Sequence, residues 1–408
     1  MLIAGEASGD LLGSELVRSL REELASNEVA PTEDYQPLCT SLEPCFFGAG
    51  GPCMKATGVE LAFDLTAHSV TGLSDVWRNI FKFRRLFTQL YRFALDREPD
   101  AIICIDFSGF NRRFGRAIKG YVRSHQGWFH DWNPKLIQYV SPQVWASREG
   151  RAYQMAKDFD LLLSIFPFEK DWYARRVPQL RVEFVGHPIV DRYSSSKGEL
   201  PNAEYDAHHS AGLQPSTVKV LLLPGSRTGE LARHLPVMVG AWEKISKARA
   251  DLRALILLPN ESLAKQARSS ALPASVSIQV GGLADSLKEA TLAIASTGTV
   301  TMECAYFGVP TVALYKTSWL TYEVAKRLVK VKYLAMPNLL VDEPIFPEFI
   351  QHAATSENIA GAALALLDDA KRRADVRSRL AQITDSLASP GASRRAAKAI
   401  CEMLRHKG

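Results

Sequence analysis

Little in this sequence suggests a secreted, disulfide-bonded or membrane-spanning protein. The cysteines show no CxxC pair and no zinc-like spacing, so we expect reduced thiols of the cytosol. They are Cys39, Cys45, Cys53, Cys104, Cys304 and Cys401. No apolar run approaches the length of a spanning helix, and Glu6 and Asp10 interrupt the N-terminal run, so no secretory signal is expected. We therefore expect a cytoplasmic protein whose contact with a membrane, if it has one, is peripheral.

The sequence also lacks a strong charge imbalance and the GxGxxG fingerprint of dinucleotide-binding folds. The first glycine-containing turn reads Gly5-Glu6-Ala7-Ser8-Gly9-Asp10, which does not fit that fingerprint. A net charge of +5 is compatible with anionic ligands or a membrane surface and is diagnostic of neither. At 408 residues and 47% hydrophobic residues, the chain is long enough and apolar enough for two domain cores.

The stretch Lys219–Leu231 (KVLLLPGSRTGEL) organises the second half of the chain. A short run of branched apolar residues ends at Pro224-Gly225, as a buried parallel strand does, and a helix is expected to follow. The N–H groups of the turn at Gly225 and Ser226, together with Arg227, can bind a diphosphate at the carboxyl edge of a sheet. The alternative is an ordinary strand–turn–helix unit with a surface arginine.

A second such unit follows at Leu292–Tyr315. Its strand runs into a turn of small residues that includes Thr297, Gly298 and Thr299, where the backbone and hydroxyl groups can approach phosphate oxygens. Glu303, in the next helix, is placed to accept hydrogen bonds from ribose hydroxyls, or else offsets the helix dipole. Two turns of this kind in one half of the chain favour a nucleotide site.

In the first half, polar side chains follow two expected strands. Glu6 and Ser8 come after the strand at residues 1–4, and Asp106 comes after Ala101–Ile105. Carboxylates at such strand ends face the ligand edge, so Asp106 is a candidate base or substrate anchor. Ser8 and Asp106 could instead cap the helices that follow them. Asn338, near the other end of the chain, could bind a ligand or close a turn.

The segment Ser69–Asp96 combines aromatic and basic residues on an expected helix. One stripe of this helix is expected to face the core. The second face then carries Trp77, Phe81, Arg84, Arg85 and Phe93. A face that is both aromatic and basic suits an anionic bilayer surface. Nucleic acid would also attract such a face, but no nucleic-acid motif accompanies it. A solvated face with long side-chain stems is the third alternative. We predict membrane contact and no nucleic-acid partner.

The sequence offers one metal-binding pattern, the DxD spacing of Asp158-Phe159-Asp160. This pattern precedes its strand instead of following it, which places it at the wrong edge of the sheet. We therefore expect no metal and no cofactor.

Both halves thus predict an α/β fold with two Rossmann-like domains facing a cleft, the GT-B glycosyltransferase architecture. The predicted boundaries are residues 1–188 for a membrane-facing domain and residues 189–384 for a nucleotide-binding domain. Residues 385–408 are expected to form a C-terminal helix that packs back on the first domain.

Several short motifs of the sequence resemble those of a known family, the lipid-A-disaccharide synthases. The resemblance covers nearly the whole chain, with motifs in the order of the family. They are AGEASGD at 4–10, YVSPQVWA at 139–146, FPFEKDWY at 166–173, FVGHP at 184–188, LLPGSR at 222–227, TGTVTMEC at 297–304 and LAMPNLL at 334–340.

The resemblance implies an inverting transfer of 2,3-diacylglucosamine from its UDP derivative to the 6-hydroxyl of 2,3-diacylglucosamine 1-phosphate (lipid X). The products would be the β-1',6-linked lipid A disaccharide 1-phosphate and UDP, made at the inner face of the cytoplasmic membrane. The family's site residues match Glu6 and Ser8 in the first motif, Arg227 at the diphosphate, Gly298, Thr299 and Glu303 at the UDP, and Asn338 in the last motif.

One departure from the family concerns the base. Many members read D-x-P-D-F-N where this chain has Asp106-Phe107-Ser108-Gly109-Phe110-Asn111, so the second aspartate is Gly109 here. Asp106 is then the first candidate for the base and Glu6 the second. Two alternative functions stay open: a UDP-sugar epimerase of the same architecture, and a non-catalytic protein that binds lipid or nucleotide.

Overall fold

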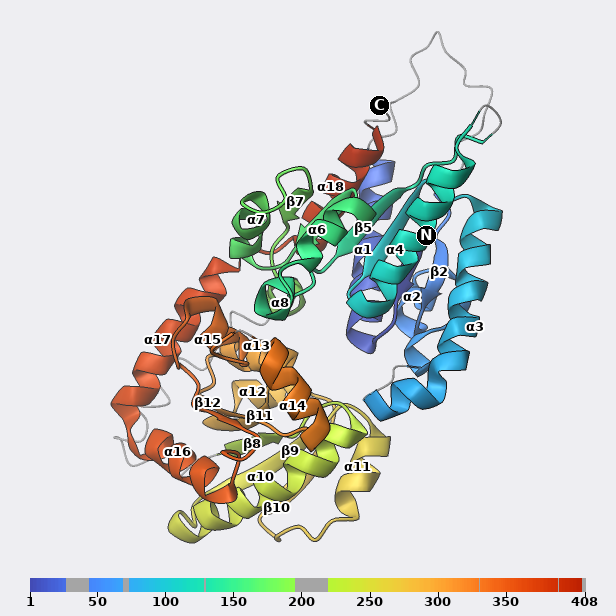
Figure 1. Ribbon diagram of the computed structural model, residues 1–408. Coiled ribbons are helices and arrows are strands. Elements are labelled where there is room, and N and C mark those ends of the chain that lie inside the picture. Colours follow the sequence, from blue (N-terminus) through green and yellow to red (C-terminus); the bar gives the residue numbers. More distant parts are fainter. Residues whose placement is uncertain are drawn as a thin grey trace. The chain divides into compact units, whose positions relative to one another are not determined.

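The computed structural model divides the chain into two compact units (Figure 1). Unit 1 comprises Met1–Asp191 and Leu387–Gly408, and unit 2 comprises Arg192–Ser386. The described residues are 1–26, 44–68, 73–127, 130–194, 219–329, 331–387 and 389–405. For residues 73–81 only the backbone is described.

Unit 1 is built on a parallel seven-stranded sheet in the order β3-β2-β1-β4-β5-β6-β7. Its strands are β1 Leu2–Ala4, β2 Phe47–Gly50, β3 Glu60–Asp64, β4 Ala101–Ile105, β5 Lys135–Tyr139, β6 Leu161–Ser164 and β7 Arg181–Phe184. Its helices are α1 Ala7–Ala25, α2 Pro52–Ala56, α3 Leu73–Arg97, α4 Ser108–His125, α5 Val144–Ser147, α6 Arg151–Asp158, α7 Pro167–Ala174 and α18 Ala392–Arg405, with α8 Pro188–Tyr193 leading into unit 2.

Unit 2 has a parallel six-stranded sheet in the order β10-β9-β8-β11-β12-β13. Its strands are β8 Lys219–Leu223, β9 Arg253–Leu258, β10 Val276–Val280, β11 Leu292–Ser296, β12 Thr311–Tyr315 and β13 Glu348–Ile350. Its helices are α10 Thr228–Ala248, α11 Glu261–Arg268, α12 Leu283–Lys288, α13 Thr299–Tyr306, α14 Trp319–Leu328, α15 Met336–Val341, α16 Ser356–Asp368 and α17 Ala370–Ser386.

The central strands of both sheets are short apolar runs because helices cover both faces of a doubly wound sheet. All five residues of β4 (AIICI) and of β11 (LAIAS) are buried. This is the pattern from which the sequence predicted parallel strands, and the two-domain α/β prediction is confirmed.

The order of strands locates the ligand edge of each unit. In a doubly wound sheet, ligands bind beyond the carboxyl ends of the two strands between which the chain direction reverses. That reversal falls between β1 and β4 in unit 1 and between β8 and β11 in unit 2. The predicted residues Glu6 and Asp106 follow the first pair of strands, and the turns at Gly225 and Gly298 follow the second pair.

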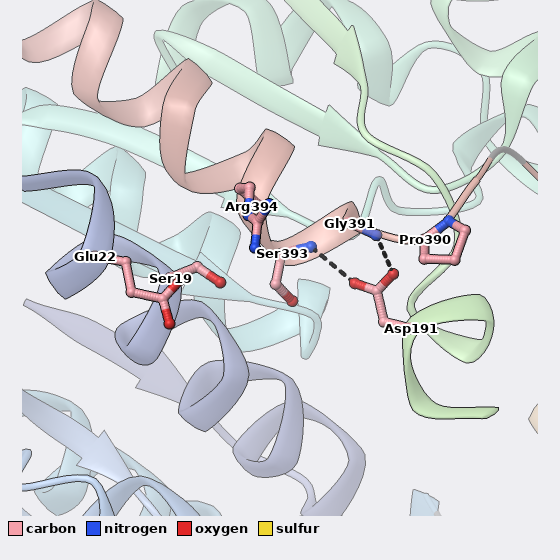
Figure 2. Close-up of a pocket in the computed structure, with 7 residues that line it drawn as sticks. All are labelled: Ser19, Glu22, Asp191, Pro390, Gly391, Ser393 and Arg394. Carbon is pink, nitrogen blue, oxygen red and sulfur yellow. Dashed lines mark hydrogen bonds between the residues drawn. The ribbon is translucent and has the colours of Figure 1, made fainter. Parts of the chain in front are cut away.

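The last helix completes unit 1. Helix α18 packs beside α1, and the two lie together in Figure 1 at opposite ends of the colour scale. The carboxylate of Asp191 accepts hydrogen bonds from the backbone N–H groups of Gly391 and Ser393, so it caps the start of α18 (Figure 2). A cavity of about 380 Å³ opens beside this joint. It is lined by Ser19, Glu22, Asp191, Pro390, Gly391, Ser393 and Arg394, none of which was predicted as a site residue.

Helix α3 corrects part of the membrane prediction. Phe93, assigned from sequence to the exposed face, packs edge-on against Phe47 with ring centroids 5.2 Å apart, because α3 lies against β2. Leu86 is also buried in this core. Arg84 and Arg85 are exposed as predicted, whereas the side chains of Trp77 and Phe81 lie outside the described residues. Among the described helices, none is long and apolar enough to cross a membrane.

Candidate active site

The turn after β8 has the shape expected for binding a diphosphate. Gly225 has a φ of 115°, and a Cβ at this position would lie 2.4 Å from Oε2 of Glu230, so only glycine fits. Arg227 directly precedes α10 and is 45% exposed, with its Nη1 3.8 Å from Oε1 of Glu230. The first N–H groups of a helix have no partner within the helix, so they and Arg227 could bind an anion together.

The turn after β11 leaves open space beside the helix that follows. Gly298 directly precedes α13, with a φ of 144°, and nothing lies within 4 Å of where its Cβ would be. Gly298 and Thr299 are exposed, and Thr297 is half-buried. The hydroxyl of Thr301 donates to the Gly298 carbonyl at 2.6 Å and stabilises the turn. The open side of the turn is therefore available to a ligand.

Glu303 lies half-buried on α13. In this structure its Oε1 accepts a hydrogen bond of 3.1 Å from the Tyr193 hydroxyl and lies 3.8 Å from Nη1 of Arg192. Burial raises the pKa of Glu303, and the charge of Arg192 opposes that rise. Neither partner was predicted, because both lie in a polar stretch without periodicity.

One buried histidine joins the turns on both sides of β11. His234, on α10, has Nδ1 2.8 Å from the Pro224 carbonyl, while the Lys316 N–H donates to its Nε2 at 3.0 Å. A carbonyl can only accept, so the neutral ring with its proton on Nδ1 satisfies both contacts. Burial also lowers the pKa of His234. His234 thereby holds the ends of β8 and β12 on either side of the Thr297–Thr299 turn.

Asn338 lies in a buried hydrogen-bond network of unit 2, and its predicted catalytic role stays a prediction. Its side chain is fully buried, and its Nδ2 donates to the Phe346 carbonyl and to Oε1 of Glu348, both at 2.7 Å. Its Oδ1 accepts from the Phe346 N–H at 2.8 Å. These three hydrogen bonds close a turn, which is the alternative role that we also predicted for Asn338 from the sequence.

In unit 1, the predicted carboxylates lie at the ends of two adjacent strands. β1 pairs with β4, so Glu6 and Asp106 follow neighbouring strand ends. The ring of Phe107 lies against Gly5, where a Cβ would come within 2.3 Å of it, so the two turns are packed together. Glu6 and Asp106 are half-buried, whereas Ser8 is exposed in the first turn of α1.

Hydrogen bonds stabilise an unusual backbone conformation at Asp106. Asp106 and Phe107 both have positive φ values, 46° and 42°, a costly conformation for residues with a Cβ. Two buried amides stabilise it, because Asn111 and Gln138 donate to the Asp106 carbonyl at 2.9 and 3.2 Å. Gly109 is exposed, with nothing within 4 Å of a Cβ at that position. The missing aspartate therefore leaves open space and no compensating side chain.

Two residues that the sequence analysis did not assign organise the rest of this edge. Asp10 is buried, and its carboxylate accepts from the N–H groups of Gly51, Cys53 and Met54 at 2.7 to 3.1 Å, which ties α1 to the start of α2. Only the AGEASGD motif hinted at a role for Asp10. The second residue that was not assigned from the sequence is Glu169, in the FPFEKDWY motif.

Glu169 joins two of the recognised motifs. It is fully buried at the start of α7, and its Oε1 accepts a hydrogen bond of 2.9 Å from Nε1 of Trp145, in the YVSPQVWA motif. Its Oε2 has no hydrogen-bond partner among the described residues. Burial raises the pKa of Glu169 to about 7, and the bond from Trp145 opposes this in part.

Basic and amide side chains donate hydrogen bonds to both carboxylates of the DxD pattern. Lys119 donates to both oxygens of Asp160 at 2.9 and 2.8 Å, and Gln154 donates to both oxygens of Asp158 at 3.0 and 3.1 Å. Within the described residues, no group of three or more His, Cys, Asp or Glu side chains could hold a metal ion.

Two doubly wound units, each with a parallel sheet, are the architecture of the GT-B class of glycosyltransferases and nucleotide-sugar epimerases. The glycosyltransferase of kitacinnamycin shares this fold with a TM-score of 0.61 at 16% identity, over 99% of this chain and 98% of that one. The UDP-GlcNAc 2-epimerase of Neisseria meningitidis, bound to UDP-GlcNAc, has a TM-score of 0.56 at 11% identity, over 86% and 88% of the chains. At these identities the similarity shows the fold alone.

Sequence comparison is more specific. A family model described as lipid-A-disaccharide synthetase matches residues 1–402. The lipid-A-disaccharide synthases of Geobacter sulfurreducens and Geobacter metallireducens are each 35% identical to the chain, over 99% and 100% of it and 97% of their own lengths. The chain belongs to the lipid-A-disaccharide synthetase family and is a glycosyltransferase of the GT-B fold.

Proposed function

We propose that this protein transfers 2,3-diacylglucosamine from UDP-2,3-diacylglucosamine to the 6-hydroxyl of lipid X, with inversion, to form the β-1',6-linked disaccharide 1-phosphate. The observation that carries the donor assignment is the pair of turns at the reversal point of the unit 2 sheet. Their glycines at 225 and 298, the start of α10 and Arg227 fit a nucleoside diphosphate better than a neutral ligand.

Unit 2 would bind the donor. The diphosphate would lie on the turn of Gly225, Ser226 and Arg227 and beside Thr297–Thr299, and the ribose hydroxyls would donate to Glu303. For that contact Glu303 would have to share or exchange its present partners, Tyr193 and Arg192.

Unit 1 would bind the acceptor and supply the base. A carboxylate at this edge would take the proton of the 6-hydroxyl as its oxygen attacks the anomeric carbon, with Asp106 as first candidate and Glu6 as second. The positive φ at Asp106 and the two amides on its carbonyl support a fixed orientation of this residue.

Departure of UDP would be assisted by Arg227 and by the helix N-termini, which stabilise the charge that develops on the leaving diphosphate. We propose that no metal is required for this step, since a guanidinium and oriented N–H groups supply the needed positive potential. Turnover should then be unchanged by EDTA, and a loss that added Mg²⁺ restores would refute this part of the proposal.

We further propose that the protein works at the inner face of the cytoplasmic membrane as a peripheral protein. The exposed Arg84 and Arg85 on α3 would contact anionic lipid there. After the correction at Phe93, the apolar part of this contact rests on Trp77 and Phe81 alone.

The test is release of UDP from UDP-2,3-diacylglucosamine with and without lipid X. Release that requires lipid X, with the disaccharide 1-phosphate as product, supports the transferase. An epimerised sugar without transfer would identify an epimerase, and binding of UDP without any turnover would identify a non-catalytic protein.

A further inference from the structure

A cluster of arginines lies beside the proposed acceptor edge of unit 1 and takes no part in the mechanism above. It consists of Arg112, Arg113 and Arg116 on α4 and Arg148 at the end of α5. Arg112 and Arg116 are one helical turn apart and therefore share a face of α4. The four guanidinium groups carry like charges, and a bound anion would offset their repulsion.

Among the described residues, Asp158 is the carboxylate that pairs with this cluster. Asp158 is buried, 3.6 Å from Nε of Arg116, and both of its oxygens also accept from Gln154. No carboxylate of the described chain forms an ion pair with Arg112, Arg113 or Arg148. Glu149, the neighbour of Arg148 in sequence, pairs with Arg176 instead.

The packing of α4 brings the arginines of this cluster close to Asp158. α4 packs on α6, and a Cβ at Gly115 would lie 3.2 Å from the ring of Phe159 and 3.6 Å from the Asp158 carbonyl. Arg112 is only half-exposed. Its pKa is lowered, first by burial and then by the nearby charges of Arg116, Arg113 and Arg148, whereas Asp158 opposes this.

The position of the cluster points to its ligand. α4 starts directly after Asp106-Phe107, and Arg112 lies about 6 Å along the helix from Ser108 at about 1.5 Å per residue. Arg148 follows the adjacent strand, β5, at the same edge of the sheet. Arg112 and Arg148 therefore both lie on segments that begin at the edge of the sheet that carries Asp106.

We infer that Arg112 and Arg148, with Arg116, form the binding site for the phosphomonoester of the acceptor, the 1-phosphate of the sugar whose 6-hydroxyl attacks. This inference rests on the proposed function. A guanidinium binds phosphate oxygens through two parallel hydrogen bonds, so the site selects an acceptor that carries phosphate and orients its ring. An anionic phospholipid headgroup presents the same chemistry and is the competing source of phosphate.

The experiment compares Arg112→Gln and Arg148→Gln with wild type in neutral detergent micelles. Each variant should raise the KM for lipid X about 10- to 100-fold, the loss expected for hydrogen bonds to a charged group. The value of kcat and the affinity for UDP should stay near those of wild type. Arg123→Gln, in the last turn of the same helix, is the matched control and should change neither constant.

A second acceptor, 2,3-diacylglucosamine without the phosphate, separates binding of the phosphate from general damage. Wild type should use it poorly, and the variants should use it as well as wild type does. An equal loss on both acceptors would overturn the inference. Arg112→Lys keeps the positive charge but lacks the paired N–H donors of the guanidinium, so it should have an intermediate KM for lipid X. If Arg112→Gln fails to fold, as judged by circular dichroism, the exposed Arg148→Gln alone decides.

Sedimentation with phosphatidylglycerol vesicles tests the other source. Variants that lose vesicle binding but keep the wild-type KM in micelles would assign the cluster to the membrane and overturn the inference. If wild type itself releases no UDP with lipid X, the proposed function fails. Normal wild-type turnover with unchanged KM in both variants would overturn this inference alone.

Discussion

Glu169 should make unit 1 less stable as the pH rises from 4.5 to 7. In the folded protein burial holds the pKa of this carboxyl at about 7, against an ordinary value of 4.5. Between these values the folded state keeps a proton that the unfolded state has lost, so the free energy of unfolding decreases with rising pH. At about 1.4 kcal/mol for each tenfold change in proton affinity, the whole decrease is about 3 kcal/mol.

Glu169→Gln removes this dependence. The glutamine keeps an Oε1 that can accept from Trp145 and carries no charge, so the variant should resemble wild type at pH 4.5 and exceed its stability above pH 7 by up to about 3 kcal/mol. Glu149→Gln, on the surface of the same unit, is the control, since an exposed ion pair contributes about 0 to 1 kcal/mol.

The assay must report on unit 1 alone, because a chain of two units need not unfold in one step. Urea unfolding followed by hydrogen exchange and mass spectrometry of the β5 and β6 peptides meets this need. Equal pH slopes for wild type and Glu169→Gln, or a variant less stable than wild type at pH 8, would refute the assignment of a buried neutral carboxyl.

Four further predictions concern the site. Arg227→Ala should reduce kcat about 10²- to 10³-fold in the UDP-release assay, as loss of one transition-state donor does; a near-normal rate would remove it from the site. Asp106→Asn should cost at least about 100-fold in turnover and Glu6→Gln less, and the reverse order would make Glu6 the base. His234→Ala should weaken UDP binding about tenfold by calorimetry, because it leaves two backbone groups unpaired, and an unchanged Kd would show that the turn holds without it. Asn338→Ala should destabilise unit 2 by about 3 kcal/mol in urea unfolding, whereas lost turnover at full stability would restore a catalytic role.

The strands were predictable because their signal is local. The run Ala101–Ile105 coincides with β4, since the central strands of a covered parallel sheet must be apolar and the run ends at a turn. The turns that follow them were predictable for the same reason, because parallel strands bring their carboxyl ends to one edge.

What the sequence could not show depends on contacts between distant residues. Helical periodicity placed Phe93 on an outer face, but β2 supplies Phe47 as a partner there. Asn338 was predicted either to bind a ligand or to close a turn, and only the fold shows that Glu348 and Phe346 use its amide. His234 gave no signal in the sequence, because its partners lie on the ends of two strands that are not neighbours.

The place of α18 has a consequence for synthesis of the chain. Residues 192–386 form a continuous unit that can fold as soon as it leaves the ribosome, whereas α1 receives its covering helix only when residues 392–405 emerge. The first unit to be translated is therefore the last to be finished, and the side of α1 that packs on α18 stays uncovered through most of translation. A nonsense codon near the 3' end of the reading frame would leave unit 2 intact and unit 1 open to aggregation.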